Sequence, residues 1–270
     1  MSPPIRVVVA PNPGPMTGPG TNQYLLGDAP AVLIDVAPLD DENRRRLEAT
    51  GTAIGRIVLT HCHPDHVGGA LAARERFGAP IAVHRRHAAT TAMGAPLAPD
   101  LLLDDGDEIP WSHGRLIALH TPGHESGHLC FFAPEQGWLF TGDTVLSTGT
   151  TIIPYPDGDM AAYFRSLARL RALDLRRIYP GHGPPIDEPT KILDDYVRHR
   201  RAREQQIVDC VRAGMAALPQ IVAHCYAGVP ALLHGAAAQT VRSHLAKLVA
   251  DGVLRQSAAE EFAYQAPGAG

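Results

Sequence analysis

Short apolar runs separated by turn residues dominate the first two thirds of the chain. The runs are short and end in Gly, Pro, Asn or Asp, as is typical of strands. We expect strands at residues 23–26, 31–36, 56–59, 80–84, 115–119, 129–132, 137–140 and 177–179. Between several of these runs, apolar residues recur at helical spacing, which predicts helices over residues 40–50, 69–77 and 159–170. Strands that alternate with helices indicate an α/β fold.

The pattern changes near Pro189. A long helical pattern over residues 190–213 is followed by shorter ones over 218–226 and 237–250. Short apolar segments that include Val253, Leu254, Phe262 and Tyr264 then flank a turn, as in a hairpin. Three helices followed by a hairpin is the order of a winged helix-turn-helix module. We therefore expect one domain over residues 1–189, and a linker helix with a small winged-helix domain over 190–270.

Composition and charge narrow the class of protein. Of the 270 residues, 45% are hydrophobic and 19% are charged, which fits a folded globular chain and excludes bulk disorder. The net charge of −4 argues against binding of nucleic acid through bulk basic charge, although basic residues exceed acidic ones after Pro189. No apolar run approaches the roughly 18 residues of a membrane span. We therefore expect no membrane partner. The four cysteines form no C-x-x-C pair, and such sparse use suits a reducing compartment, so we expect a cytoplasmic protein.

Fourteen histidines are the unusual feature of the composition. The strongest motif is His61-Cys62-His63-Pro64-Asp65-His66, which directly follows a predicted strand. His61 and His63, two residues apart, can point the same way and hold one metal ion, because side chains alternate along an extended chain. Asp65 and His66, beyond the turn at Pro64, can reach a second metal ion. Imidazole and carboxylate suit Zn²⁺ first, and Mn²⁺ or Fe²⁺ can take the same ligands.

Three further fragments repeat the order of strand, turn and candidate ligand. They are Thr121-Pro122-Gly123-His124, Thr141-Gly142-Asp143 and Pro180-Gly181-His182-Gly183. A glycine beside each candidate allows a sharp turn of the backbone, so we expect all three fragments to converge on the centre formed by the first motif. His128, four residues after His124, is interpreted either as a support for the metal site or substrate, or as a structural histidine.

In this order, H-x-H-x-D-H, T-P-G-H, T-G-D and P-G-H-G resemble the motifs of the metallo-β-lactamase fold superfamily. The resemblance implies an αββα sandwich with two metal ions between its sheets. By motif, one metal would bind His61, His63 and His124. The other would bind Asp65, His66 and His182, and Asp143 would bridge the two. Asp65 and Asp143 are then the candidate catalytic carboxylates, which orient the attacking water or take its proton.

A narrower resemblance, to the β-lactamase-like protein 2 group, rests on the predicted winged helix and on residues 12–14, 20–25, 149–151, 179–184 and 199–206. That group includes an endoribonuclease for single-stranded RNA and fungal thioesterases that act on carrier-bound polyketides. We therefore expect a dinuclear zinc hydrolase. Single-stranded RNA is the first expected substrate, favoured by the resemblance and the basic C-terminal part. A thioester or related small acyl compound is the alternative, favoured by the net negative charge.

Other functions are less well supported by the sequence. Asp143 within Thr-Gly-Asp departs from the usual pattern of true β-lactamases. A non-catalytic winged-helix regulator would not need all seven candidate ligands. Proteins with a redox di-iron site tend to carry Glu where this chain has His63. Neither a P-loop nor a G-x-G-x-x-G after a strand is present, so we expect no organic cofactor.

The C-terminal part is expected to shape access to the site. The predicted helix over 237–250 begins with residues that offer no base-edge donors, so we expect no sequence-specific binding of DNA. If the substrate is RNA, Arg200, Arg201 and Arg203 are the expected phosphate contacts. Removal of the chain after Pro189 is then expected to leave metal binding intact and to weaken RNA cleavage.

Overall fold

The computed structural model describes residues 4–215, 217–256 and 264–265. The chain forms two compact units. The first contains the chain up to Thr121 together with residues 127–150 and 172–192. The second contains residues 122–126, residues 151–171 and the chain from Leu193 onward. Within the described residues, no helix combines the length and the apolar character that crossing a membrane requires.

Two β-sheets make up most of the first unit. The larger sheet has the order β1-β2-β3-β4-β5-β8, with bounds Ile5–Val9, Asn22–Leu26, Ala31–Ile34, Ile54–Val58, Ile81–His84 and Leu101–Leu103. The smaller sheet has the order β13-β12-β11-β10-β9, with bounds Arg177–Pro180, Trp138–Gly142, Leu129–Ala133, Gly114–His120 and Glu108–Trp111. Strands β3, β4 and β5 are parallel to one another, and so are β12 and β13. The segments that follow these strands therefore leave their sheets at the carboxyl edge, where sites of α/β proteins lie.

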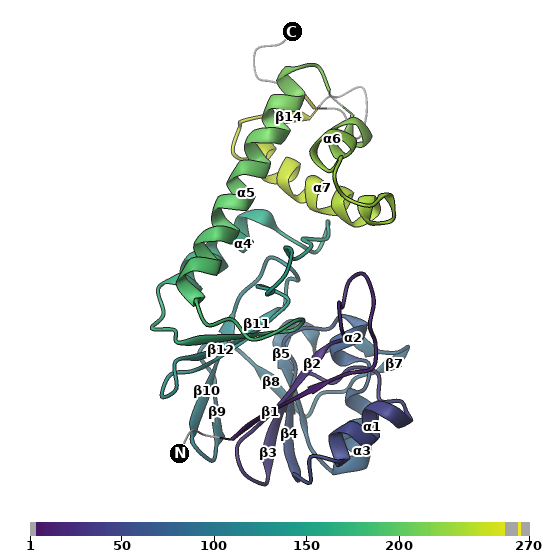
Figure 1. The fold of residues 1–270 in the computed structure, drawn as a ribbon, viewed down its shortest axis with the longest axis vertical. Helices are drawn as coiled ribbons and strands as arrows, with labels where there is room; N and C mark the ends of the chain where they lie inside the picture. Colours follow the sequence, from purple (N-terminus) through teal and green to yellow (C-terminus); the bar gives the residue numbers. More distant parts are fainter. Residues whose placement is uncertain (1–3, 216, 257–263, 266–270) are drawn as a thin grey trace. The chain divides into compact units, whose positions relative to one another are not determined.

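The inner faces of the two sheets share one apolar core. Ile34 and Val58 from the larger sheet are buried in the same cluster as Phe131 and Phe140 from the smaller one. The outer face of the larger sheet is covered by α1 (Asp41–Glu48) and α3 (Ala70–Phe77), as Figure 1 shows. Asp40 caps the start of α1, because its carboxylate accepts a 2.8 Å hydrogen bond from the backbone amide of Asn43. Burial of both faces of the larger sheet explains why its inner strand β3 consists only of apolar residues, all of them buried.

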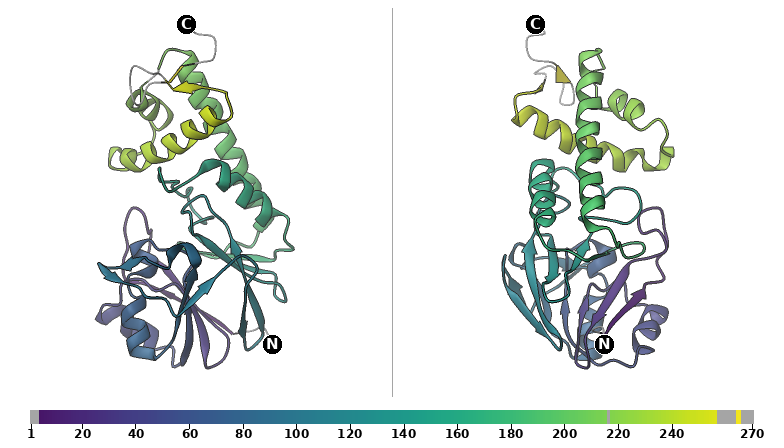
Figure 2. Two further views of the ribbon diagram at one scale, coloured as in Figure 1. Left: turned by 180° about the vertical axis from the view of Figure 1, so that it is seen from behind. Right: turned by 60° about the vertical axis from the view of Figure 1, so that its left-hand side comes forward.

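The second unit is mainly helical. Its helices are α4 (Met160–Arg171), most of α5 (Pro189–Arg212), α6 (Leu218–Cys225) and α7 (His234–Ala250). A short antiparallel pair, β14 (Arg255–Gln256) and β15 (Tyr264–Gln265), follows them. Figure 2 shows α6 and α7 beside the C-terminal half of α5. Apolar residues from all three helices form one core, among them Ile207, Ile221 and Val241.

Most predicted elements are present, with ends that differ by a few residues. The structure adds three strands of the two main sheets that the sequence pattern did not predict, namely β1, β8 and β9. β1 and β8 lie at the two edges of the larger sheet and β9 at one edge of the smaller, and each of these edge strands has exposed residues. Short strand pairing also occurs between β6 (Thr91–Ala92) and β7 (Ala95–Pro96). Phe262, expected in the last strand, lies outside the described residues.

Candidate metal centre

The predicted ligands of the first unit lie where parallel strands end. His61 and His63 follow β4, and the short helix α2 (Pro64–Val67) then carries Asp65 and His66. Pro64 at the first position of α2 suits a helix start, because its ring sets the helical φ angle and the position needs no amide donor. Asp143 follows β12, and His182 follows the neighbouring parallel strand β13.

Asp65, His66 and His182 each offer a ligand atom within 4.8 Å of the other two, and Asp143 lies beside both histidines. Asp65 Oδ2 lies 3.3 Å from His66 Nε2 and 3.2 Å from His182 Nε2. Asp143 Oδ1 lies 3.3 Å from each of these nitrogens, which are themselves 3.3 Å apart. Bonds of about 2.0–2.1 Å from zinc to nitrogen or oxygen, at tetrahedral angles, place neighbouring ligands about 3.3 Å apart. The donor types and their spacing therefore fit one divalent metal ion.

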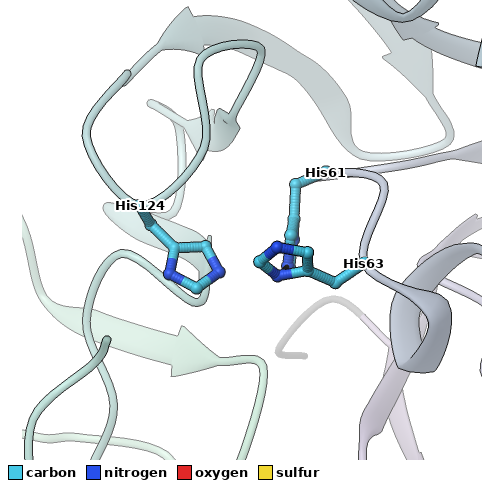
Figure 3. Close-up of side chains that lie close together, drawn as sticks. All are labelled: His61, His63 and His124. Atoms are coloured by element: carbon cyan, nitrogen blue, oxygen red, sulfur yellow. Dashed lines mark hydrogen bonds between the residues drawn. The ribbon is translucent and has the colours of Figure 1, made fainter. Parts of the chain in front are cut away.

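Three further imidazoles form a neighbouring group. His61 Nε2 is 3.1 Å from His63 Nδ1, and the ligand atoms of these two residues and of His124 all lie within 4.8 Å of one another. Figure 3 shows the three side chains turned toward one another. His124 lies in the loop between β10 and β11, whose paired residues His120 and Leu129 close its base. This nitrogen-rich set also matches what a divalent metal such as zinc binds.

The two groups are contiguous. His61, His66 and Asp143 form a third set whose ligand atoms lie within 4.8 Å of one another, and it shares members with both of the others. Each of the seven residues that the sequence predicted as ligands belongs to at least one of these sets. Asp143 lies 3.3 Å from His66 and from His182, and it also belongs to the set that contains His61. This position between the two groups is the one expected of a bridging carboxylate.

Hydrogen bonds behind the rings orient two of the imidazoles. His66 Nδ1 donates to Asp35 Oδ2 at 2.8 Å, and His124 Nδ1 donates to the carbonyl of Ile152 at 2.6 Å. With its Nδ1 carrying a proton, each ring presents the lone pair of Nε2 toward the site. Asp35 also accepts hydrogen bonds of 2.7 Å from the amide and from the hydroxyl of Thr60. Its φ of 61° is a left-handed conformation, which Asp adopts more readily than most residues.

Sequence reasoning did not identify Asp35 or Thr60 as part of the site. Asp35 is the one polar residue of the predicted strand over residues 31–36, and this was its only signal in the sequence. A further contact is Thr21, whose hydroxyl donates to Asp65 Oδ2 at 3.2 Å. These residues do not match the ligand motifs, and their hydrogen bonds span 25 to 44 residues of sequence.

His128 supports the site from within the core. It is completely buried, and its ring stacks on that of His61 with centroids 5.0 Å apart. The backbone amide of Asp143 donates to His128 Nε2 at 3.3 Å. The Nδ1 side of the ring lies 3.2 Å from the hydroxyls of Thr121 and Thr144. Of the readings that the sequence left open, the structure therefore favours support of the candidate ligands over contact with substrate.

Charge, rather than burial, sets the protonation of the cluster. Burial raises the pKa of Asp143, but His66 and His182 outweigh it and hold that pKa well below its ordinary value. Burial also raises the pKa of Asp65, and the same two histidines lower it by more. Conversely, burial lowers the pKa of His182, whereas Asp143 and Asp65 raise it to about 9. At neutral pH the carboxylates are therefore anionic and His182 holds a proton, which a metal ion binding to its ring would displace.

Two of the three arginines expected to contact phosphate are turned inward. Arg200 is only 1% exposed, donates to the carbonyl of Thr151, and lies over the Tyr163 ring with 5.4 Å from its guanidinium carbon to the ring centre. Arg203 donates to the carbonyl of Cys225 and stacks over a neighbouring tyrosine at 4.0 Å. The expectation is therefore wrong for Arg200, because burial removes its guanidinium from solvent. Arg203 is committed to contacts within the second unit, and only Arg201 is exposed.

Comparison with known sequences identifies both parts of the chain. Residues 16–182 match the model of the metallo-beta-lactamase superfamily, and residues 217–261 match that of the beta-lactamase associated winged helix domain. A Caenorhabditis elegans protein named beta-lactamase-like protein 2 homolog is 34% identical, over 93% of this chain and 86% of its own length. An atrochrysone carboxyl ACP thioesterase from Aspergillus fumigatus is 32% identical, over 77% of this chain and 65% of its own.

Solved structures agree with the fold. A metallo-beta-lactamase family protein from Thermus thermophilus matches 97% of this chain and 98% of its own, with a TM-score of 0.82 and 24% identity. Another protein, solved in a di-iron-bound form, matches 69% of this chain and 96% of its own, with a TM-score of 0.58 and 30% identity. These matches confirm the predicted α/β fold with a C-terminal winged helix. The chain therefore belongs to the metallo-β-lactamase superfamily, whose members are generally hydrolases, and it carries the winged-helix domain associated with that family.

Proposed function

We propose that this chain is a dinuclear metal-dependent hydrolase. One metal would be held by His61, His63 and His124. The second would be held by Asp65, His66 and His182, with Asp143 shared between the two. The observation that carries the proposal is the 3.2–3.3 Å spacing of the two carboxylate oxygens from the two imidazole nitrogens, which matches neighbouring ligands of one metal ion. Zinc is the metal that we expect, and the di-iron form of one structural relative makes iron the first competitor.

The chain's own residues have distinct tasks in such a reaction. When bound, the metal pair supplies Lewis-acid polarisation of the scissile group and lowers the pKa of the attacking water. The Asp65 side chain is 28% exposed, so it can orient that water and exchange a proton with solvent. Thr21 restrains the Asp65 carboxylate through its hydroxyl. Asp143 is more deeply buried and is held from behind by His128, which suits a fixed bridge better than a proton carrier.

We propose an acyl thioester as the substrate class. Arg200 and Arg203 are occupied within the second unit, which leaves Arg201 alone of the three arginines for a phosphate backbone. The fungal relative named as an acyl-carrier thioesterase supports the same class. The four cysteines, all within the described part of the chain, form no disulfide, which supports a cytoplasmic location for the reaction.

Single-stranded RNA remains the second candidate. The C. elegans relative covers more of the chain than the thioesterase does, and it carries the name of the group whose resemblance first indicated RNA. In that case Arg201→Ala would reduce the dependence of cleavage on salt by about one unit of slope, because one phosphate contact is lost.

One experiment separates these functions. The purified chain is loaded separately with Zn²⁺, Mn²⁺ and Fe²⁺ and assayed against a panel of acyl thioesters and a labelled single-stranded RNA. Chelated protein and the Asp65→Asn variant serve as controls. Thioester hydrolysis that both controls abolish supports the proposal. RNA cleavage with the same dependence would replace the substrate class, and turnover that persists in chelated protein would refute the metal-dependent mechanism.

A further inference from the structure

The orientation of His124 depends on a loop that follows β12. His124 Nδ1 donates to the carbonyl of Ile152 at 2.6 Å, and the hydroxyl of Thr151 lies 3.1 Å from the same nitrogen. Thr151 is buried, and Ile153, two residues further along, is fully buried. The imidazole is therefore aimed by the backbone of residues 151–152, and any shift of this loop rotates the ring.

Helices α5 and α7 hold that loop. From α5, Arg200 donates to the carbonyl of Thr151. From α7, the hydroxyl of Thr240 accepts a 3.2 Å hydrogen bond from the amide of Ile153. Ser243, one turn further along α7, donates to the carbonyl of Ile153 at 2.8 Å. Backbone groups on both sides of Ile152 are thus bonded to the C-terminal helices, which belong to the same compact unit as His124.

The burial of Arg200 indicates that this arrangement is specific. Among the residues that the structure describes, Arg200 forms no ion pair with a carboxylate, although desolvation of a guanidinium is costly. Its compensation is the Thr151 carbonyl and the face of Tyr163. A helix that only linked two domains could turn this arginine outward into water, as it does with Arg201.

We propose that the C-terminal helices α5 and α7 position a metal ligand. Helices α5 and α7 fix residues 151–153 so that the Ile152 carbonyl aims His124, and Arg200 is the positioning residue. The inference rests on the proposed function in that it takes His124 to be a ligand. It revises the expectation from sequence that removal of the chain after Pro189 leaves metal binding intact, because Arg200, Thr240 and Ser243 would be lost.

The test uses the full chain and the variant Arg200→Met, which keeps an unbranched side chain but removes the donors. Arg212→Met is the matched control, because Arg212 is an exposed residue of the same helix. Metal affinity is measured by competition with a chromophoric zinc chelator, and the metal content by elemental analysis. We expect one of two bound zinc ions to be held 10- to 100-fold more weakly in Arg200→Met, as for the loss of other groups that orient metal ligands. Arg212→Met should match the wild type, and Arg200→Lys should recover part of the loss.

Hydrogen exchange of metal-free protein provides a readout that does not involve metal. Amides of residues 151–158 should exchange faster in Arg200→Met than in the wild type or Arg212→Met. If Arg200→Met does not fold, Ser243→Ala replaces it, with a smaller loss in the same direction. Unchanged affinity for both zinc ions, or weaker affinity without faster exchange in this loop, would overturn the inference. A wild-type chain that binds fewer than two zinc ions would instead refute the proposed function.

Discussion

Replacement of Asp35 by Asn tests whether a residue that is not a predicted ligand controls the centre. Asp35 Oδ1 accepts from the amide of Thr60, and Oδ2 accepts from the Thr60 hydroxyl and from His66 Nδ1. Asn has nearly the same shape and tolerates the left-handed φ of 61° at this position. The substitution therefore changes charge and hydrogen bonding with little demand on the backbone.

The expected magnitude follows from these three hydrogen bonds. An Asn side chain has an acceptor oxygen on one edge and an NH2 donor on the other. In place of Asp35, the NH2 group would therefore face at least one group of Thr60 or His66 that itself donates a hydrogen bond. A buried donor left without its acceptor costs about 1–3 kcal/mol. His66 also loses the carboxylate that orients its ring, and loss of such a partner weakens metal binding about 10- to 100-fold. We expect the unfolding free energy of metal-free Asp35→Asn to be about 1–3 kcal/mol lower than that of the wild type. We also expect the variant to bind zinc about 10- to 100-fold more weakly.

Two assays measure these effects. Urea denaturation of chelated protein gives the unfolding free energy, and competition with a zinc chelator gives the affinity. Asp28→Asn is the matched control, because Asp28 also bonds a histidine, His113 at 2.9 Å, but its side chain is 69% exposed. The control should resemble the wild type in both assays. If Asp35→Asn does so as well, then Asp35 does not orient His66 and the reasoning is refuted.

Three further predictions concern the centre itself. Asp143→Ala should reduce the bound metal from two ions to one, because His61, His63 and His124 remain; elemental analysis that shows loss of both ions together would contradict this. Asp65→Asn should lower kcat by about 100-fold or more while the thermal unfolding midpoint changes little, and wild-type turnover would exclude Asp65 as base or ligand. Gly181→Ala should weaken metal binding without altering a ligand, because an added Cβ would lie 2.5 Å from Asp143 Oδ1 and 2.8 Å from His66 Cε1. We expect that crowding to cost about 1–3 kcal/mol of stability, whereas Gly235→Ala, with open space around it, should not affect zinc affinity in the same titration.

The sequence by itself determined which side chains converge on the centre. Each motif follows a strand, and parallel neighbours such as β12 and β13 deliver their carboxyl ends to the same edge of the sheet. Asp143 and His182 therefore had to lie close together once the strands were recognised. The H-x-H-x-D-H motif is local, and its internal spacing already determines which of its side chains are near one another. These relations follow from the positions of the strands, which the spacing of apolar residues predicts without any knowledge of tertiary contacts.

Only the tertiary structure decided which groups outside the motifs hydrogen-bond to these side chains and orient them. The partners of His66 and His124 are Asp35 and the Ile152 carbonyl, and neither lies in a ligand motif. The sequence also could not show which way Arg200 faces, because a solvated arginine and a buried one have the same place in a helical pattern. Its direction depends on whether a carbonyl and an aromatic face from distant segments are there to compensate the loss of water. Hydrogen-bond partners and burial are properties of the packed chain, so they appear only when segments far apart in sequence are brought together.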